Sequence, residues 1–100
     1  MRELKWTMHA KAKMGYYRLA ESRVRRVIKT PERIEVGIAE GTIALMQPNG
    51  RGKSEHEIWV MVRDLNKERR VISAWRYPGR TVLGQPLPEE ILREFREVIL

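Results

Sequence analysis

Apolar residues recur at helical spacing in two stretches of the first third of the chain. Thr7 can cap a helix from about Met8 to Tyr16, because a threonine side chain accepts a hydrogen bond from the first helical turn. A second helix is predicted from about Ala20 to Lys29, with apolar residues at i, i+3 and i+4: Val24, Val27 and Ile28. Pro31 ends this helix, because the residue before a proline avoids the helical conformation.

Beyond Pro31 the pattern becomes that of strands. Four segments are rich in Ile, Val, Trp and Thr and are separated by turn residues: Arg33 to Val36, Thr42 to Gln47, Glu57 to Leu65 and Arg70 to Tyr77. Their connections are short or polar and glycine-rich, which favours an antiparallel meander. Glu3 to Trp6 can add a short first strand ahead of the helices.

The end of the chain has the pattern of an amphipathic helix. Pro88 suits its first turn, and its apolar residues form one stripe: Ile91, Leu92, Phe95, Val98 and Ile99. We expect this helix to dock on the sheet, on a partner or on a second copy of the chain. The elements together predict an α+β fold with two N-terminal helices, a curved antiparallel four-stranded sheet and a C-terminal helix. At 100 residues the chain forms one domain, residues 1–100, with 81–100 as a C-terminal linker and helix.

The positive charge is concentrated in the N-terminal third. Residues 1–33 contain ten Lys or Arg and three Glu, which accounts for the whole net charge of +7, whereas residues 34–100 hold ten cations and ten acids. A segment this basic attracts polyanions, and phosphate contacts provide most sequence-independent affinity for nucleic acids. RNA or DNA is therefore the expected partner. The alternative is that a charged helix face only keeps a small protein in solution.

Composition narrows the other classes of function. The chain has no cysteine, which excludes disulfides and thiolate metal sites and suits a reducing compartment. It has no long apolar run and no apolar signal-peptide core near its start, so we expect a cytoplasmic protein without a membrane partner.

Two common ligand sites are disfavoured. Gly52-Lys53-Ser54 matches the end of a nucleotide-binding P-loop, but Gln47 occupies the position of the first glycine, and the pattern that follows is a strand rather than a helix. His9 and His56 are the only histidines, and neither lies in a ligand-spaced cluster. We expect neither a metal nor a cofactor.

The first candidate for chemistry is His9 with Lys13. They lie one helical turn apart and therefore share a face of the first helix, near Tyr16, Tyr17 and Arg18. A histidine transfers protons near neutral pH, and a neighbouring cation stabilises the charge of a phosphate in its transition state. The alternative is that His9 only caps or packs the helix.

The second candidate is Trp75-Arg76-Tyr77 at the end of the last predicted strand. Alternation places Trp75 and Tyr77 on one face and Arg76 on the other. Aromatic rings beside a guanidinium suit base stacking and phosphate contact. The alternative is that the two aromatic side chains belong to the core and its rim.

One string resembles the opening of a group of small bacterial domains, the BrnT-like toxins and their relatives of unassigned function: Trp6-Thr7-x-His9-Ala10-x-x-Lys13-Met14-x-x-Tyr17-x-Leu19, with Val24, Val27 and Pro31. Two later segments also fit, Glu57-Ile58-Trp59-Val60 and Ile72-Ser73-Ala74-Trp75-Arg76-Tyr77-Pro78-Gly79. The similarity covers residues 4–79. It implies a RelE-like fold of the barnase, colicin and RelE type, and metal-independent RNA cleavage. Ala20 departs from the polar helix cap expected there.

The resulting hypothesis is a small endoribonuclease, the messenger-RNA-cleaving toxin of a toxin–antitoxin pair. His9 would be the general base or acid, Lys13 and Arg76 the transition-state cations, and Tyr77 a hydrogen-bond donor or stacking residue. Glu57 is a reserve base, although its position suits an exposed strand end equally well. The expected RNA-binding residues are the remaining N-terminal cations and one tryptophan: Lys11, Arg18, Arg23, Arg25, Arg26, Lys29 and Trp75.

Two other functions are compatible with the same residues. A noncatalytic domain could use the basic N-terminal third to hold RNA, DNA or a protein. A structural adaptor could assemble through the C-terminal helix. The expected partners are accordingly RNA, a cognate antitoxin protein and a second copy of the chain.

Overall fold

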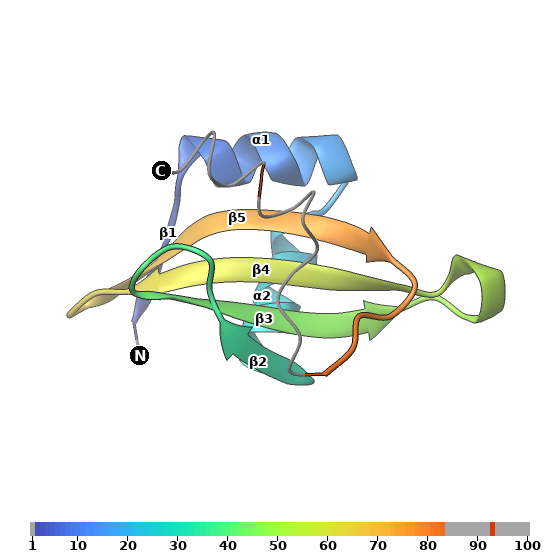
Figure 1. Cartoon of the computed structure of the whole chain (residues 1–100). Helices are drawn as coiled ribbons and strands as arrows, with labels where there is room; N and C mark the ends of the chain where they lie inside the picture. The colour runs from blue at the N-terminus through green and yellow to red at the C-terminus, as the bar shows by residue number, and fades with distance from the viewer. Residues whose placement is uncertain (1, 84–92, 94–100) are drawn as a thin grey trace.

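The computed structural model describes residues 2–83 and 93 (Figure 1). In chain order the elements are β1 (Glu3–Trp6), α1 (Met8–Tyr17), α2 (Glu21–Lys29), β2 (Arg33–Val36), β3 (Thr42–Asn49), the 3-10 turn η1 (Gly52–Ser54), β4 (His56–Asp64) and β5 (Glu68–Pro78). The α+β class and the order of helices and strands are confirmed. The predicted C-terminal helix lies outside the described residues. No helix in the described part of the chain is long and apolar enough to cross a membrane.

The sheet has five strands in the order β1-β5-β4-β3-β2. Strands β2 to β5 form the predicted antiparallel meander. The expectation of a four-stranded antiparallel sheet is nevertheless wrong, because β1 joins the edge of β5 in parallel, from Glu3 opposite Glu68 to Trp6 opposite Val71. A parallel partner this distant along the chain leaves no local hairpin signal, since the connection runs through both helices and three strands.

The ends of the elements differ slightly from the predicted ones. Thr7 caps α1 as expected, its side chain accepting a hydrogen bond from the backbone N–H of Ala10 at 3.1 Å. The helix extends to Tyr17 and ends at Arg18, which takes the left-handed conformation with φ of 56°. Ala20 stands at the N-cap of α2 and provides no side-chain bond, as its methyl group dictates. Strand β3 runs on to Asn49, because its pairing with β4 continues as far as His56.

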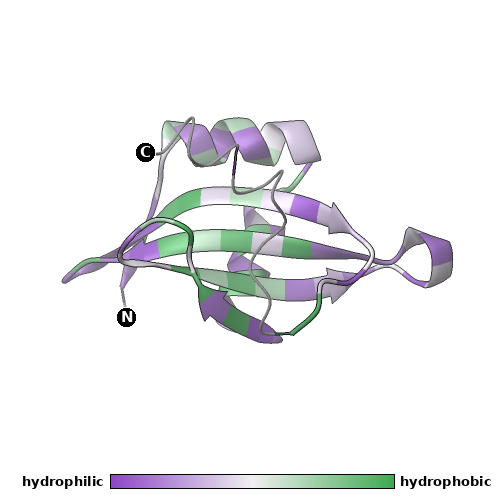
Figure 2. Ribbon diagram, viewed as in Figure 1, coloured by the Kyte–Doolittle hydropathy of each residue, from purple (hydrophilic) through white to green (hydrophobic). Residues whose placement is uncertain are grey.

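The two helices pack against the same sheet, α1 beyond β5 and α2 behind β4 and β3 in the view of Figure 1. Their buried residues, including Ala10, Met14, Val24 and Val27, join one core cluster with strand residues: Leu45, Ile58, Val60, Val62, Val71 and Ala74. A second cluster occupies the other face: Ala44, Met46, Trp59, Met61 and Trp75. Figure 2 shows the hydrophobic residues concentrated on the central strands. Both faces of these strands are therefore buried.

Candidate functional site

His9 lies in the first turn of α1, next to Ser73 of β5. Its Nε2 is 3.1 Å from the hydroxyl oxygen of Ser73. Burial, followed by the positive charge of Lys13, lowers the pKa of His9 below its usual value of 6.5. The predicted proximity of His9 and Lys13 is thus reflected in the electrostatics. Lys13 also places its ammonium 5.6 Å from the centre of the Tyr16 ring.

Arg76 lies at the opposite end of α1. Its Nε donates to the carbonyl of Tyr17 at 2.8 Å, and its Nη2 donates to the carbonyl of Arg18 at 3.3 Å. These carbonyls end α1 and lack partners within the helix, and they carry the negative end of its dipole. They therefore hold the guanidinium in a fixed orientation at the junction of α1 and β5.

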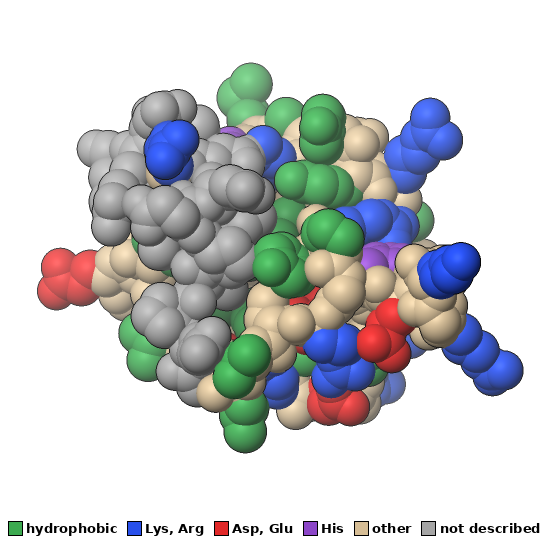
Figure 3. Space-filling model, turned by 45° about the vertical axis from the view of Figure 1, so that its right-hand side comes forward, with side chains coloured by type: hydrophobic (Ala, Val, Ile, Leu, Met, Phe, Trp, Pro, Cys, Tyr) green, Lys and Arg blue, Asp and Glu red, His purple; other side chains and the backbone are tan. Residues whose placement is uncertain are grey.

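The structure does not bring His9 and Arg76 into one site. His9 occupies the second position of α1, whereas Arg76 contacts the carbonyls of its last residue and its C-cap. At about 1.5 Å of rise per residue, these two ends lie roughly 13 Å apart along the helix axis. Histidine side chains accordingly appear at two separate places on the surface in Figure 3.

The histidine beside Arg76 is His56, at the start of β4. Its Nδ1 lies 2.8 Å from the carbonyl of Ser54, which can only accept, so Nδ1 carries a proton. Its Nε2 lies 2.8 Å from Nη1 of Arg76, which can only donate, so Nε2 is the unprotonated nitrogen. The side-chain amide of Asn49 lies 3.3 Å from the same Nε2. The contacts therefore define a neutral ring whose basic nitrogen faces a guanidinium.

Arg23, on α2, provides a second guanidinium near His56 and Arg76. Nη1 of Arg23 donates to the side-chain oxygen of Gln47 at 2.5 Å, and Gln47 is held in turn by the carbonyls of Arg26 and Thr30. Burial and the charges of Arg26 and then Arg76 lower the pKa of Arg23. Within residues 2–83 and 93, no carboxylate forms an ion pair with Arg23 or Arg76.

We call the group formed by Arg23, Gln47, Asn49, His56 and Arg76 the His56–Arg76 cluster. Sheet register explains why it forms. Gln47, Ile58 and Arg76 lie in one row across β3, β4 and β5, and Asn49 and His56 lie opposite each other two residues further along. Side chains two residues apart on a strand share a face, so both rows point toward the helices.

Other predicted site residues lie apart from this cluster. Tyr77 packs against the second core cluster on the other face from Arg76, as strand alternation predicts. Trp75 is only 2% exposed and stacks on Trp59, with ring centres 6.0 Å apart, so its ring is not open to a nucleic-acid base. The expectation that Trp75 stacks on RNA is therefore wrong, and the core alternative holds, because both faces of the central strands are buried at this point.

The remaining predicted RNA-binding residues are cations of the helices and of the α1 C-cap. Five of them are exposed: Lys11, Arg18, Arg25, Arg26 and Lys29. Arg25 places its guanidinium 5.5 Å from the centre of the Trp6 ring, on the side of α2 away from Gln47. The cations of α2 thus border two different surfaces, one at the His56–Arg76 cluster and one toward β1.

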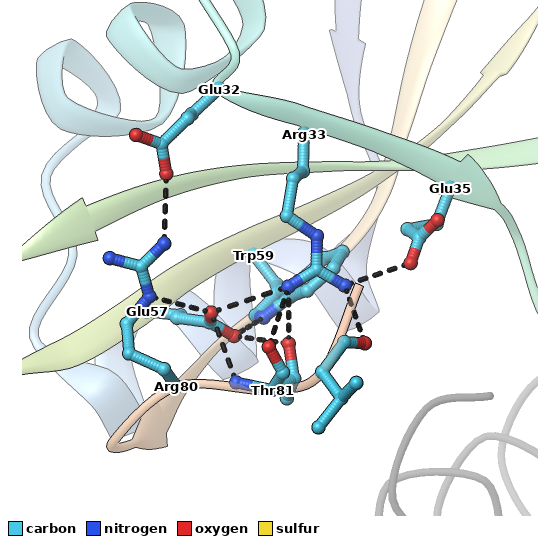
Figure 4. A network of polar contacts seen from close by, with 8 residues as sticks. Glu32, Arg33, Glu35, Glu57, Trp59, Arg80 and Thr81 are labelled. Atoms are coloured by element: carbon cyan, nitrogen blue, oxygen red, sulfur yellow. Dashed lines mark hydrogen bonds and ion pairs between the residues drawn. The ribbon is translucent and has the colours of Figure 1, made fainter. Parts of the chain in front are cut away.

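Glu57 is wholly buried, so its placement at an exposed strand end is wrong. Its carboxylate accepts the indole N–H of Trp59 at 2.9 Å and both the hydroxyl and the backbone N–H of Thr81, at 2.7 and 3.1 Å. Two arginines complete the network in Figure 4: Nε of Arg80 at 3.2 Å and Nη1 of Arg33 at 3.5 Å. Both carboxylate oxygens are engaged, so the geometry is that of a structural tie between the sheet and the segment after β5 rather than of a base.

Sequence reasoning missed His56, Gln47 and Asn49 as partners of Arg76. The signal that could have found them is the register of the β3–β4 and β4–β5 hairpins, because it places polar residues of three strands in adjacent rows. The predicted third strand ended before Asn49, and the predicted fourth strand began after His56. The pairing of these two residues was therefore not predicted.

In the part of the chain that the structure describes, no three His, Cys, Asp or Glu side chains gather as a metal-binding group would require. Compared with protein-family models, with curated proteins and with solved structures, the chain matches none.

Proposed function

We propose that this domain binds RNA at the His56–Arg76 cluster and cleaves it without a metal. The observation that carries the proposal is the position of Arg76: it has no acidic partner among the described residues and directs Nη1 at the unprotonated nitrogen of His56. A cation beside a neutral histidine combines the two requirements of RNA cleavage, phosphate binding and proton transfer.

The surrounding charge supports RNA as the ligand. Arg23 adds a second guanidinium to the cluster, and the exposed cations Arg18, at the C-cap of α1, and Arg26, on α2, flank it. Figure 3 shows Lys and Arg side chains around a histidine at one end of the molecule. Excess positive charge of this kind attracts a phosphate backbone irrespective of base sequence.

The chemistry uses the ribose 2′-hydroxyl as the nucleophile. His56 Nε2 accepts the hydroxyl proton while the 2′-oxygen forms a bond to the adjacent phosphorus, and the bond from phosphorus to the 5′-oxygen breaks. The 5′-oxygen takes a proton from solvent, which leaves a 2′,3′-cyclic phosphate. Arg76 and Arg23 stabilise the doubly charged phosphorane between these steps. This assignment transfers the role of base from His9 to His56.

The second candidate function is binding without cleavage. One observation favours it: Nε2 of His56 already faces two donors, from Arg76 and Asn49, so the ligand must displace them before the nitrogen can accept a proton. The same cluster would then hold a phosphate and perform no chemistry.

The deciding experiment incubates a long single-stranded RNA with the purified chain in excess chelator and maps the product ends. We expect 2′,3′-cyclic-phosphate or 3′-phosphate ends. We also expect a loss of rate of about 100- to 10,000-fold in His56→Ala, the usual contribution of a general base. His9→Ala is the matched variant, because it removes the other histidine at the opposite end of α1 and should leave the rate largely unchanged.

Three outcomes separate the candidates once circular dichroism shows that each variant is folded. Cleavage that disappears in His56→Ala supports the ribonuclease. Binding without cleavage, weakened in Arg23→Gln, supports the noncatalytic domain. Cleavage that survives His56→Ala but disappears in His9→Ala contradicts the assignment to the cluster and returns the base to the first turn of α1.

The toxin hypothesis is retained as part of the proposal. A ribonuclease that cuts messenger RNA in its own cell requires a protein that restrains it, so we expect the gene of a small antitoxin next to that of this chain. An isolated gene would weaken this part of the proposal without bearing on the chemistry.

A further inference from the structure

A cavity of about 770 Å³ lies between α2, β1 and the start of β5, on the side of α2 away from Gln47. Seven residues line it: Arg2, Glu3, Leu4, Arg25, Ile28, Lys29 and Arg69. Its volume falls within the usual range of small-molecule sites, about 300–1,000 Å³. It holds four cationic side chains and one carboxylate, and none of them belongs to the His56–Arg76 cluster.

The four cations differ in how far their charge is already neutralised. Arg69 forms a two-pronged ion pair with Asp64, at 2.5 and 2.8 Å. Arg2 donates to the carbonyl of Leu65 at 3.0 Å and lies 3.9 Å from the same Asp64. The two positive charges are therefore shared with one carboxylate, which leaves this wall of the cavity weakly positive.

Arg25 and Lys29 are the available charges. They lie four residues apart on α2, so they project from the same face of the helix. Among the residues that the structure describes, neither has a carboxylate within ion-pair distance, and the Arg25 guanidinium lies 5.5 Å from the centre of the Trp6 ring. Glu3, the carboxylate of the cavity, is engaged by Lys5 at 3.3 Å.

The apolar part of the lining comes from Leu4 and Ile28, both packed against the first core cluster. A bare phosphate would leave most of the volume and this apolar surface unused. A nucleotide would use both, with its phosphates at Arg25 and Lys29 and its ring against Leu4 and Ile28. A guanidinium and an ammonium are the two side-chain groups that proteins use most often for phosphate.

We propose that this cavity binds a nucleotide through its 5′-phosphates and its ring. The site does not depend on the proposed ribonuclease, since it uses other residues on the opposite side of α2. A free nucleotide and the 5′-phosphorylated end of an RNA present the same chemistry, and the test separates them.

The test is isothermal titration calorimetry of the full chain with adenosine diphosphate, pyrophosphate and adenosine. We expect adenosine diphosphate to bind at least tenfold more tightly than pyrophosphate, because only the nucleotide reaches the apolar lining, and we expect no detectable binding of adenosine. A short RNA with and without a 5′-phosphate forms a second arm, read as the gain in affinity from that phosphate because RNA also binds at the proposed His56–Arg76 cluster. A gain that is lost in Arg25→Gln/Lys29→Gln assigns the site to an RNA end, and no gain assigns it to a free nucleotide.

Two double variants with the same change of charge locate the site. Arg25→Gln/Lys29→Gln removes both available charges and should weaken binding of adenosine diphosphate at least tenfold. Lys11→Gln/Lys53→Gln removes two exposed charges outside the cavity and should change it less than twofold. The proposal is overturned if pyrophosphate binds as tightly as the nucleotide, if both double variants weaken binding equally, or if nothing binds to the folded wild-type chain.

Discussion

Glu57 provides the sharpest test of how this fold is held together. Replacing it with Gln keeps the shape of the side chain but removes its charge and presents an amide N–H group to other donors. Arg33, whose side chain is only 10% exposed, then loses one of its two carboxylate partners and keeps Glu35 at 2.8 Å. The N–H of Thr81 and the indole of Trp59 compete for a single remaining oxygen.

The magnitude follows from burial. Because Arg33 stays paired with Glu35, the main cost is that of the buried donors left without an acceptor, about 1–3 kcal/mol. The Arg80 pair adds little to this, because its side chain is 42% exposed and screened by solvent. Against a typical total stability of about 5–15 kcal/mol, the loss is appreciable, and a fall in Tm of at least ~4 °C is expected for a chain of this size.

The assay is urea unfolding followed by tryptophan fluorescence, since Trp59 and Trp75 lie in the core. Glu40→Gln is the matched control: it removes an exposed carboxylate that forms no ion pair with any residue the structure describes, and it should stay within about 0.5 kcal/mol of wild type. A Glu57→Gln protein within about 0.5 kcal/mol of wild type would refute the reasoning, because the buried network would then contribute no more than a surface contact.

Two further variants test particular features. Arg18 adopts a left-handed backbone conformation with φ of 56°, so Arg18→Gly should raise the free energy of unfolding by about 0.5–1 kcal/mol in urea denaturation, and a loss of stability would contradict the assigned strain. Because the pKa of His9 is lower in the folded chain than in the unfolded one, the unfolded chain binds more protons once the pH falls toward 6.5. The free energy of unfolding of the wild type should therefore decrease as the pH falls from about 6.5 through the folded-state pKa. His9→Asn should lose less stability than wild type between pH 7.5 and pH 5, and identical pH profiles would contradict the lowered pKa of the partly buried ring.

Local patterns predicted most of the fold. The spacing of Val24 and Val27 correctly predicted α2. The alternation along β5 correctly predicted that Trp75 and Arg76 lie on opposite faces of the sheet. The parallel pairing of β1 with β5 was not predictable in this way, because it depends on how both helices pack before the strands meet.

The candidate site was harder to predict because its members are distant in sequence. Arg76 was identified from its aromatic neighbours, yet its contacts are the end of α1 and His56. Glu57 looked like an exposed strand end because its own segment is otherwise apolar. The two arginines and Thr81, which compensate its burial, come from before β3 and after β5. The periodicity of apolar residues in one segment does not reveal partners that come from distant segments of the chain.

A contact between Arg76 and an RNA phosphate would appear in the salt dependence of RNA binding. The affinity for a short single-stranded RNA that cannot be cleaved is measured over a range of salt concentrations for wild type and Arg76→Gln, with folding verified for both. Each phosphate contact contributes about 0.7 to the slope of log affinity against log salt for single strands. We predict weaker binding and a slope reduced by about 0.7 in the variant; an unchanged affinity and slope would contradict the account.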